Sequence, residues 1–217
     1  MQDDELILEQ EEEQTPEEPG GWRYEVYSTL RDFVWILTIV TILFVFVIRL
    51  VGVDGSSMYP TLYDRDYLLL TSNVLDRDFK NGDIVVLSKS IPEVPQLDST
   101  PIVKRVIATA GQTVDIDFDL GRVTVDGEVL DEPYINDLTH LNYGDGLTYP
   151  ATVPEGCIFV MGDNRNNSTD SRYAPVGMVD TRYVVGSVLL RVFPGRTTDA
   201  RGTVTGGRDF SRLGVVK

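Results

Sequence analysis

The chain has 217 residues, 42% of them hydrophobic, so it can bury the core of one domain and is not disordered as a whole. Its formal net charge is −15, but residues 1–32 alone carry eleven acidic residues against two arginines. Binding to phosphates requires clustered lysine and arginine, so no nucleic-acid partner is expected. A single cysteine and a single histidine exclude an internal disulfide and any metal site built from several such residues. No metal and no cofactor are expected.

Residues 1–32 are predicted to form a solvated acidic tail, in which Pro16 and Pro19 interrupt any helix. A long apolar run follows, with no charged residue over 33–48 and only Arg49 before it ends at residue 53. About 20 helical residues cross the ~30 Å hydrocarbon layer, so we predict a single transmembrane helix over 33–53. The lysines and arginines on its two sides do not by themselves decide its orientation.

Short runs of β-branched and aromatic residues occupy 54–194, and turn dipeptides such as Asn81-Gly82 and Asp126-Gly127 separate them. They predict a mainly β domain, an antiparallel sheet or barrel-like fold, with a shorter inserted segment at about 121–155. Residues 195–217 are predicted to be a loose C-terminal tail. The clearest expected strands are 67–70, 83–87, 102–108, 113–116, 122–125, 157–161 and 183–193.

Lys104 is the one lysine of four that lies within an apolar strand pattern. Alternation along the strand places it on the same face as Ile102 and Val106. Removal of an ammonium group from water lowers its pKa, as a lysine general base requires. A lysine that reaches water from the strand edge is the alternative, which the pattern alone favours.

Two further segments carry reactive or densely polar side chains. Gly55–Leu62 contains two adjacent serines, Ser56 and Ser57, either of which could act as a nucleophile if a base lay nearby. Met161–Arg172 is rich in Asp, Asn and Arg, which predicts a tightly ordered loop. A calcium-binding loop is disfavoured because the terminal glutamate of such loops is absent.

Together these segments resemble type I signal peptidases, the membrane-anchored Ser–Lys proteases. The similarity extends from the apolar run to about Arg191. The matching motifs stand in the family's order and are Ser57–Leu62, Gly82–Val85, Lys104–Val106 and Gly162–Arg172. His140 matches no motif, so the branch that uses histidine in place of lysine is not indicated.

The resemblance implies that Ser57, which directly precedes the methionine, is the nucleophile and that Lys104 is its general base. It implies that Ser168 hydrogen-bonds and orients the Lys104 amine, and that the Ser57 backbone N–H is an oxyanion donor. Gly55 stands where some members carry a serine whose hydroxyl is a second donor, so that donor is not identified. The supporting ion pairs implied are Asp170 with Arg172 and Asp163 with Arg105.

The resemblance also implies the substrates and the location. Shallow pockets would select small residues at the −1 and −3 positions of signal-peptide-bearing preproteins. The protein would be a single-pass plasma-membrane protein, with a cytoplasmic N-terminus and its catalytic domain on the other side of the bilayer. The residues expected to line the substrate pocket are Val53, Gly55, Leu62, Ile102 and Val103.

Two other functions remain as alternatives. A self-cleaving repressor-type Ser–Lys protease shares the dyad, but a tail and an apolar run stand where its DNA-binding domain would be. A non-enzymatic, membrane-anchored β module that binds extended peptides is the other. Cleavage of an added preprotein distinguishes the signal peptidase from both.

Overall fold

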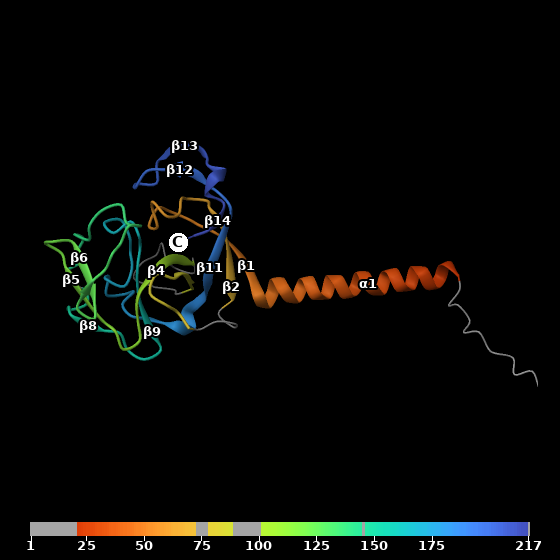
Figure 1. Ribbon diagram of the computed structural model, residues 1–217, viewed down its shortest axis with the longest axis horizontal. Helices are drawn as coiled ribbons and strands as arrows, with labels where there is room; N and C mark the ends of the chain where they lie inside the picture. Colours follow the sequence, from red (N-terminus) through yellow and green to blue (C-terminus); the bar gives the residue numbers. More distant parts are fainter. Residues whose placement is uncertain (1–20, 73–77, 89–100, 145, 217) are drawn as a thin grey trace, which may run out of the picture. The chain divides into compact units, whose positions relative to one another are not determined.

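The computed structural model describes residues 21–72, 78–88, 101–144 and 146–216. The chain divides into two compact units, one ending at Ile42 and the other beginning at Leu43. Figure 1 shows a helical N-terminal unit and a second unit built from strands. Of the acidic tail predicted over residues 1–32, residues 1–20 lie outside the described residues. The prediction is wrong for residues 22–32, which belong to a helix.

The apolar run does not form one helix with the predicted bounds. Helix α1 spans Trp22–Ile42, a π-helical turn follows at Leu43–Val47, and strand β1 spans Ile48–Gly52. The predicted helix over 33–53 is therefore wrong for residues 48–52. All five residues of β1 pair with strand β2, and this sheet pairing overrides the continuous apolar pattern. Within the described residues, no helix combines the length and the apolar character needed to cross a membrane.

The predicted mainly β, antiparallel fold is confirmed. Among the described residues the largest sheet has the order β1-β2-β11-β3-β4-β9-β10, with β14 also paired to β11. The order does not return to its first strand, so the sheet is open rather than a closed barrel. The strands after β1 are β2 (Tyr67–Ser72), β3 (Ile84–Leu87), β4 (Ile102–Thr109), β9 (Cys157–Met161), β10 (Val179–Asp180), β11 (Val184–Phe193) and β14 (Gly214–Val215).

A smaller sheet in the order β7-β6-β5-β8 lies between β4 and β9 in the chain and includes much of the segment predicted at 121–155. The turn between β6 and β7 needs positive φ at both central residues, and Asp126 and Gly127 adopt φ of 53° and 85°. Its strands are β5 (Thr113–Asp117), β6 (Arg122–Val125), β7 (Glu128–Val129) and β8 (Ala151–Thr152).

The prediction of a loose tail over 195–217 is wrong. Strands β12 (Arg196–Thr198) and β13 (Val204–Arg208) form a hairpin, and β14 returns to the main sheet beside β11. Short 3₁₀ turns occur at Thr181–Tyr183 and Phe210–Arg212. These strands are short and their side chains are mostly exposed, so their sequence shows only weak hydrophobic periodicity and did not predict them.

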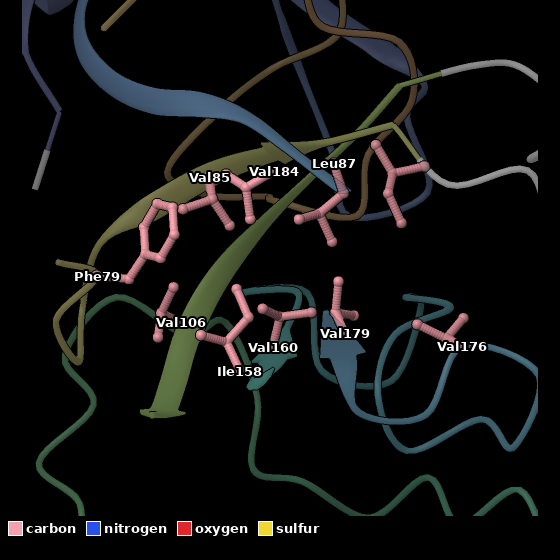
Figure 2. Close-up of a cluster of buried hydrophobic side chains, with 10 residues drawn as sticks. Phe79, Val85, Leu87, Val106, Ile158, Val160, Val176, Val179 and Val184 are labelled. Carbon is pink, nitrogen blue, oxygen red and sulfur yellow. The ribbon is translucent and has the colours of Figure 1, made fainter. Parts of the chain in front are cut away.

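The core is arranged on both sides of strands β3 and β4. Val85 and Leu87 belong to one buried cluster with Val106, whereas Ile84 and Val86 belong to another. Figure 2 shows the first cluster, in which side chains of β3 and β11 face those of β4, β9 and β10. Both strands are buried throughout, except at Thr109. The polar side chains of Lys104 and Arg105 on β4 are therefore largely removed from solvent.

Candidate active site

Ser57 and Lys104, 47 residues apart in the chain, meet at one end of strand β4. The Lys104 Nζ lies 2.7 Å from the Ser57 Oγ and donates to the Val103 carbonyl at 3.0 Å. Only 3% of Lys104 is exposed. The alternative in which the amine reaches water from the strand edge is thus wrong, because the amine lies in the interior against the serine hydroxyl.

The burial of Lys104 changes its acid–base properties. Desolvation lowers its pKa from 10.5 to about 8, although the nearby carboxylates of Asp170 and Asp163 partly oppose this shift. A substantial fraction of the amine is therefore neutral near pH 8. A neutral amine has the free electron pair that a proton acceptor needs.

Asp170 and Arg172 form a buried ion pair behind the lysine. The Arg172 Nε and Nη2 donate to the two oxygens of Asp170, each at 2.9 Å. Burial opposes ionisation of Asp170, but Arg172 outweighs it, so the pKa of the carboxyl lies below its ordinary value. The negative charge beside Lys104 is therefore retained over the working pH range.

The expected hydrogen bond between Ser168 and the Lys104 amine is not formed. The Ser168 Oγ donates to Asp170 Oδ2 at 2.8 Å, and among the described residues the amine is hydrogen-bonded to Ser57 and Val103. The fully ionised carboxylate is the stronger acceptor, which accounts for the difference. Ser168 thus supports the site through Asp170. The Tyr143 hydroxyl donates to the main-chain carbonyl of Ser168.

Arg105, on the strand position after the lysine, pairs with Asp163 as the resemblance implied. Its Nε and Nη2 donate to the two carboxylate oxygens at 2.8 and 2.7 Å, and both residues are buried. The Thr61 Oγ1 donates to the same carboxylate at 2.5 Å. The pair therefore joins β4, the serine segment and the loop after β9. Gly162 permits this close approach, because a Cβ there would collide with Ser168 and the Ser57 carbonyl.

A second support was missed in the sequence. The fully buried Arg165 forms an ion pair with the partly buried Glu132, and the centroid of the Tyr134 ring lies 3.9 Å from the Arg105 guanidinium. Desolvation and the Glu132 charge raise the pKa of Tyr134 to about 12. Glu132 and Tyr134 lie in the inserted segment, outside any of the motifs, and nothing in the sequence indicated that they would contact the site.

A cleft of about 420 Å³ opens beside the serine and the lysine. Of the residues expected to line it, Val53, Gly55, Ile102 and Val103 do so, whereas Leu62 does not. Leu62 is fully buried in the core cluster that contains Met58 and Leu68, because the 55–62 segment turns inward after the serine. The other lining residues are Asp54, Ser56, Ser57, Pro101, Lys104, Asn167 and Thr169.

No cluster of three or more His, Cys, Asp or Glu side chains suited to a metal ion occurs in the part of the chain that the structure describes. What the site does contain is a serine hydroxyl beside a buried amine of lowered pKa, in an open cleft. Such an arrangement suits nucleophilic attack on a carbonyl by an activated serine. It is the arrangement of a serine hydrolase.

The chain belongs to the family described as signal peptidase, peptidase S26, whose profile matches residues 26–193, and it is thus a serine peptidase. It is 35% identical to signal peptidase I S of Bacillus subtilis over 65% of this chain and 75% of that protein. It is 33% identical to a probable signal peptidase I of Synechocystis over 86% and 92% of the two chains. A solved signal peptidase I from Enterococcus faecalis is 29% identical, with a TM-score of 0.40, over 51% of this chain and 96% of that one.

Proposed function

We propose that this protein removes N-terminal signal peptides from exported preproteins, with Ser57 as nucleophile and Lys104 as general base. The observation that carries the proposal is the 2.7 Å contact between the Ser57 hydroxyl and a buried amine. A pKa of about 8 supports the role, since such an amine can accept a proton near neutral pH and release it again. Membership of the signal peptidase family supplies the substrate class.

The proposed reaction has two stages. Ser57 Oγ attacks the scissile carbonyl while its proton passes to neutral Lys104, and the Ser57 N–H donates to the oxyanion that forms. Lys104 then returns the proton to the leaving amine, the peptide bond breaks, and an acyl-enzyme remains. A water molecule that gives its proton to Lys104 attacks the ester, and Ser57 regains a proton as the signal peptide departs.

The substrate is proposed to bind as an added strand beside β4. Residues 102–104 pair with β3 on one side, and pairing with β9 starts only at Arg105, so no strand among the described residues pairs with the other edge of 102–104. That edge faces the cleft. An extended peptide can pair with the backbone on that edge, with alternate side chains directed at Val53, Ile102 and Val103. Shallow contacts of this kind favour small residues at −1 and −3, because larger side chains do not fit.

Cleavage of a purified preprotein with Ala at −1 and −3 tests this function. We expect one cut, directly after the −1 Ala, as identified by the mass of the mature product. Phe at either position should lower kcat/KM at least about 100-fold, whereas Phe at −2 should have little effect because that side chain points away from the cleft. Release of fragments from the peptidase alone would instead indicate a self-cleaving protease.

We also propose that residues 33–47 associate with the membrane as an anchor, with the N-terminus in the cytoplasm and the peptidase unit outside. The apolar side chains of this stretch support the proposal, since Phe33, Trp35 and Ile36 are each more than 60% exposed and such a surface needs apolar cover.

Membrane extraction tests the proposed anchor. The full chain should stay in the membrane pellet after alkaline carbonate washing. External protease on protoplasts should digest the peptidase unit and spare an epitope at the N-terminus. Recovery in the wash, or loss of the epitope, would contradict the anchor or its orientation.

A further inference from the structure

Asn164 holds both peptide groups that flank the serine. Its main-chain N–H donates to the Ser57 carbonyl at 3.0 Å, and its side-chain Nδ2 donates to the Ser56 carbonyl at 3.0 Å. The residue is 2% exposed. It lies in the loop after β9, more than 100 residues away in the chain. One residue from another part of the fold therefore holds the main chain on both sides of Ser57.

The contact with the Ser56 carbonyl fixes the direction of the Ser57 N–H. These two groups belong to one peptide unit, which is planar, and in a trans peptide they point in opposite directions. The Tyr59 N–H also donates to the Ser56 carbonyl, at 3.0 Å. Two donors to the carbonyl thus hold the N–H pointing in the opposite direction within the peptide plane, and this N–H is the oxyanion donor of the proposed mechanism.

The C-terminal segment completes the arrangement. The Ala200 carbonyl accepts a second hydrogen bond from Asn164 Nδ2 at 2.7 Å and one from Asn167 Nδ2 at 3.0 Å. Because both partners of Asn164 Nδ2 are carbonyls, only the NH₂ end of the amide can satisfy them. In Figure 1 the β12–β13 hairpin lies beside the segment that contains Ser56. Ala200 lies beyond residue 193, where the family match ends.

The loop that presents Ala200 is closed by hydrogen bonds of its own. The Asp199 Oδ1 accepts from the N–H groups of Arg201 and Thr203 at 2.9 and 2.8 Å, and two main-chain hydrogen bonds close the same turn. Gly202 has a φ of 82°, a conformation that a side chain would strain. A Cβ at this position would stand 3.5 Å from that of Ser56, so the loop packs directly on the serine segment.

We infer that Asn164 is a positioning residue that aims the Ser57 N–H at the oxyanion, and that the 199–203 loop holds Asn164 in place through the Ala200 carbonyl. The inference rests on the proposed function, since it concerns the same oxyanion. It assigns a role in the reaction to the C-terminal hairpin, which lies outside the family match. It also explains how one fixed N–H serves a site in which Gly55 offers no hydroxyl and donates its own N–H to Asp64.

Kinetics of Asn164→Ala, compared with Asn166→Ala, test the inference. Asn166 is an exposed neighbour in the same loop that makes three hydrogen bonds away from the serine, so it controls for loosening of the loop. We expect Asn164→Ala to lower kcat about 10- to 100-fold, less than the 10²–10³-fold typical when an oxyanion donor is removed outright. KM and the pH at which activity rises should stay unchanged, and Asn166→Ala should retain the original kcat.

A peptide aldehyde ending in Ala gives a second readout. Ser57 Oγ adds to the aldehyde carbon, the C=O double bond opens, and the proton passes to Lys104, which leaves an oxyanion in the same place as in the reaction. Its Ki should rise in Asn164→Ala by the same factor by which kcat/KM falls. An unchanged kcat and Ki would overturn the inference, as would a loss matched by Asn166→Ala.

Variants of Asp199, on the surface, test the same inference even if Asn164→Ala does not fold. Asp199→Ala removes the acceptor of the two loop N–H groups and should lower kcat severalfold, whereas Asp199→Asn keeps an oxygen acceptor and should restore it. Equal activity of the two variants would contradict the role of the loop. Cleavage by Ser57→Ala would refute the proposed function, whereas an inactive Ser57→Ala with a fully active Asn164→Ala would refute only the positioning role.

Discussion

Ser57→Ala and Lys104→Ala should each lower kcat for preprotein cleavage by at least about 10⁴-fold. Ser57 supplies the bond to the substrate, and no other base lies within hydrogen-bonding distance of its hydroxyl among the described residues. In other serine proteases, removal of the serine nucleophile or of its base lowers kcat by a factor of this order. The residual activity comes from the remaining oxyanion donors and from substrate binding. Initial rates with a purified preprotein measure the effect.

A double variant shows whether Ser57 and Lys104 act together in one step or contribute independently. Since both residues act in one step, Ser57→Ala combined with Lys104→Ala should be no slower than either single variant. Lys80→Ala is a suitable control because Lys80 is exposed and is not among the residues that line the cleft. Substantial cleavage by Lys104→Ala would show that another group accepts the serine proton.

The pH profile should show one group that must be deprotonated, with a pKa of about 8. Lys104 acts as a base only when neutral, so kcat/KM should fall tenfold for each pH unit below about 8 and level off above about 9. At pH 6 the protein should retain about 1% of its maximal kcat/KM by the same titration. An activity that is flat between pH 6 and 9 would contradict Lys104 as the general base.

The same pKa shift links pH to stability. The unfolded chain has a lysine pKa of 10.5, so between about pH 8 and 10.5 the unfolded state binds more protons and the contribution of Lys104 to the unfolding free energy rises with pH. The full difference corresponds to about 3 kcal/mol, which is the cost of a buried ammonium group below pH 8. Lys104→Met should remove this cost, so an inactive protein with a higher Tm at pH 7 is expected.

The sequence predicted the strands more accurately than it predicted the ends of the apolar run. Alternation on β4 correctly grouped Ile102 with Val106 and identified Lys104 as the unusual lysine, because side-chain direction in a strand follows from the backbone. Residues 48–52 and β14 were misjudged, since their pairing depends on separate segments of the chain. The local β12–β13 hairpin was missed because its strands are short and mostly exposed.

Among the supporting contacts of the site, likewise, some were predicted and others were not. Asp163 and Arg105 meet as the resemblance implied, but the Ser168 hydroxyl is directed to Asp170 and Leu62 to the core. No pattern in the sequence indicated Glu132 or the contact of Asn164 with Ser56. Such contacts are set by how distant loops pack, and a single sequence records the residue types but not which loops meet.

The central claim is that the Ser57 oxygen forms the bond to the substrate, and the position of the acyl group tests it most directly. A preprotein reaction stopped with acid within the first turnover, then digested and fragmented in a mass spectrometer, should yield the signal peptide esterified to Ser57. The adduct should be absent from Ser57→Ala and present in Ser56→Ala. An ester on Ser56, or on any residue outside this segment, would contradict the account.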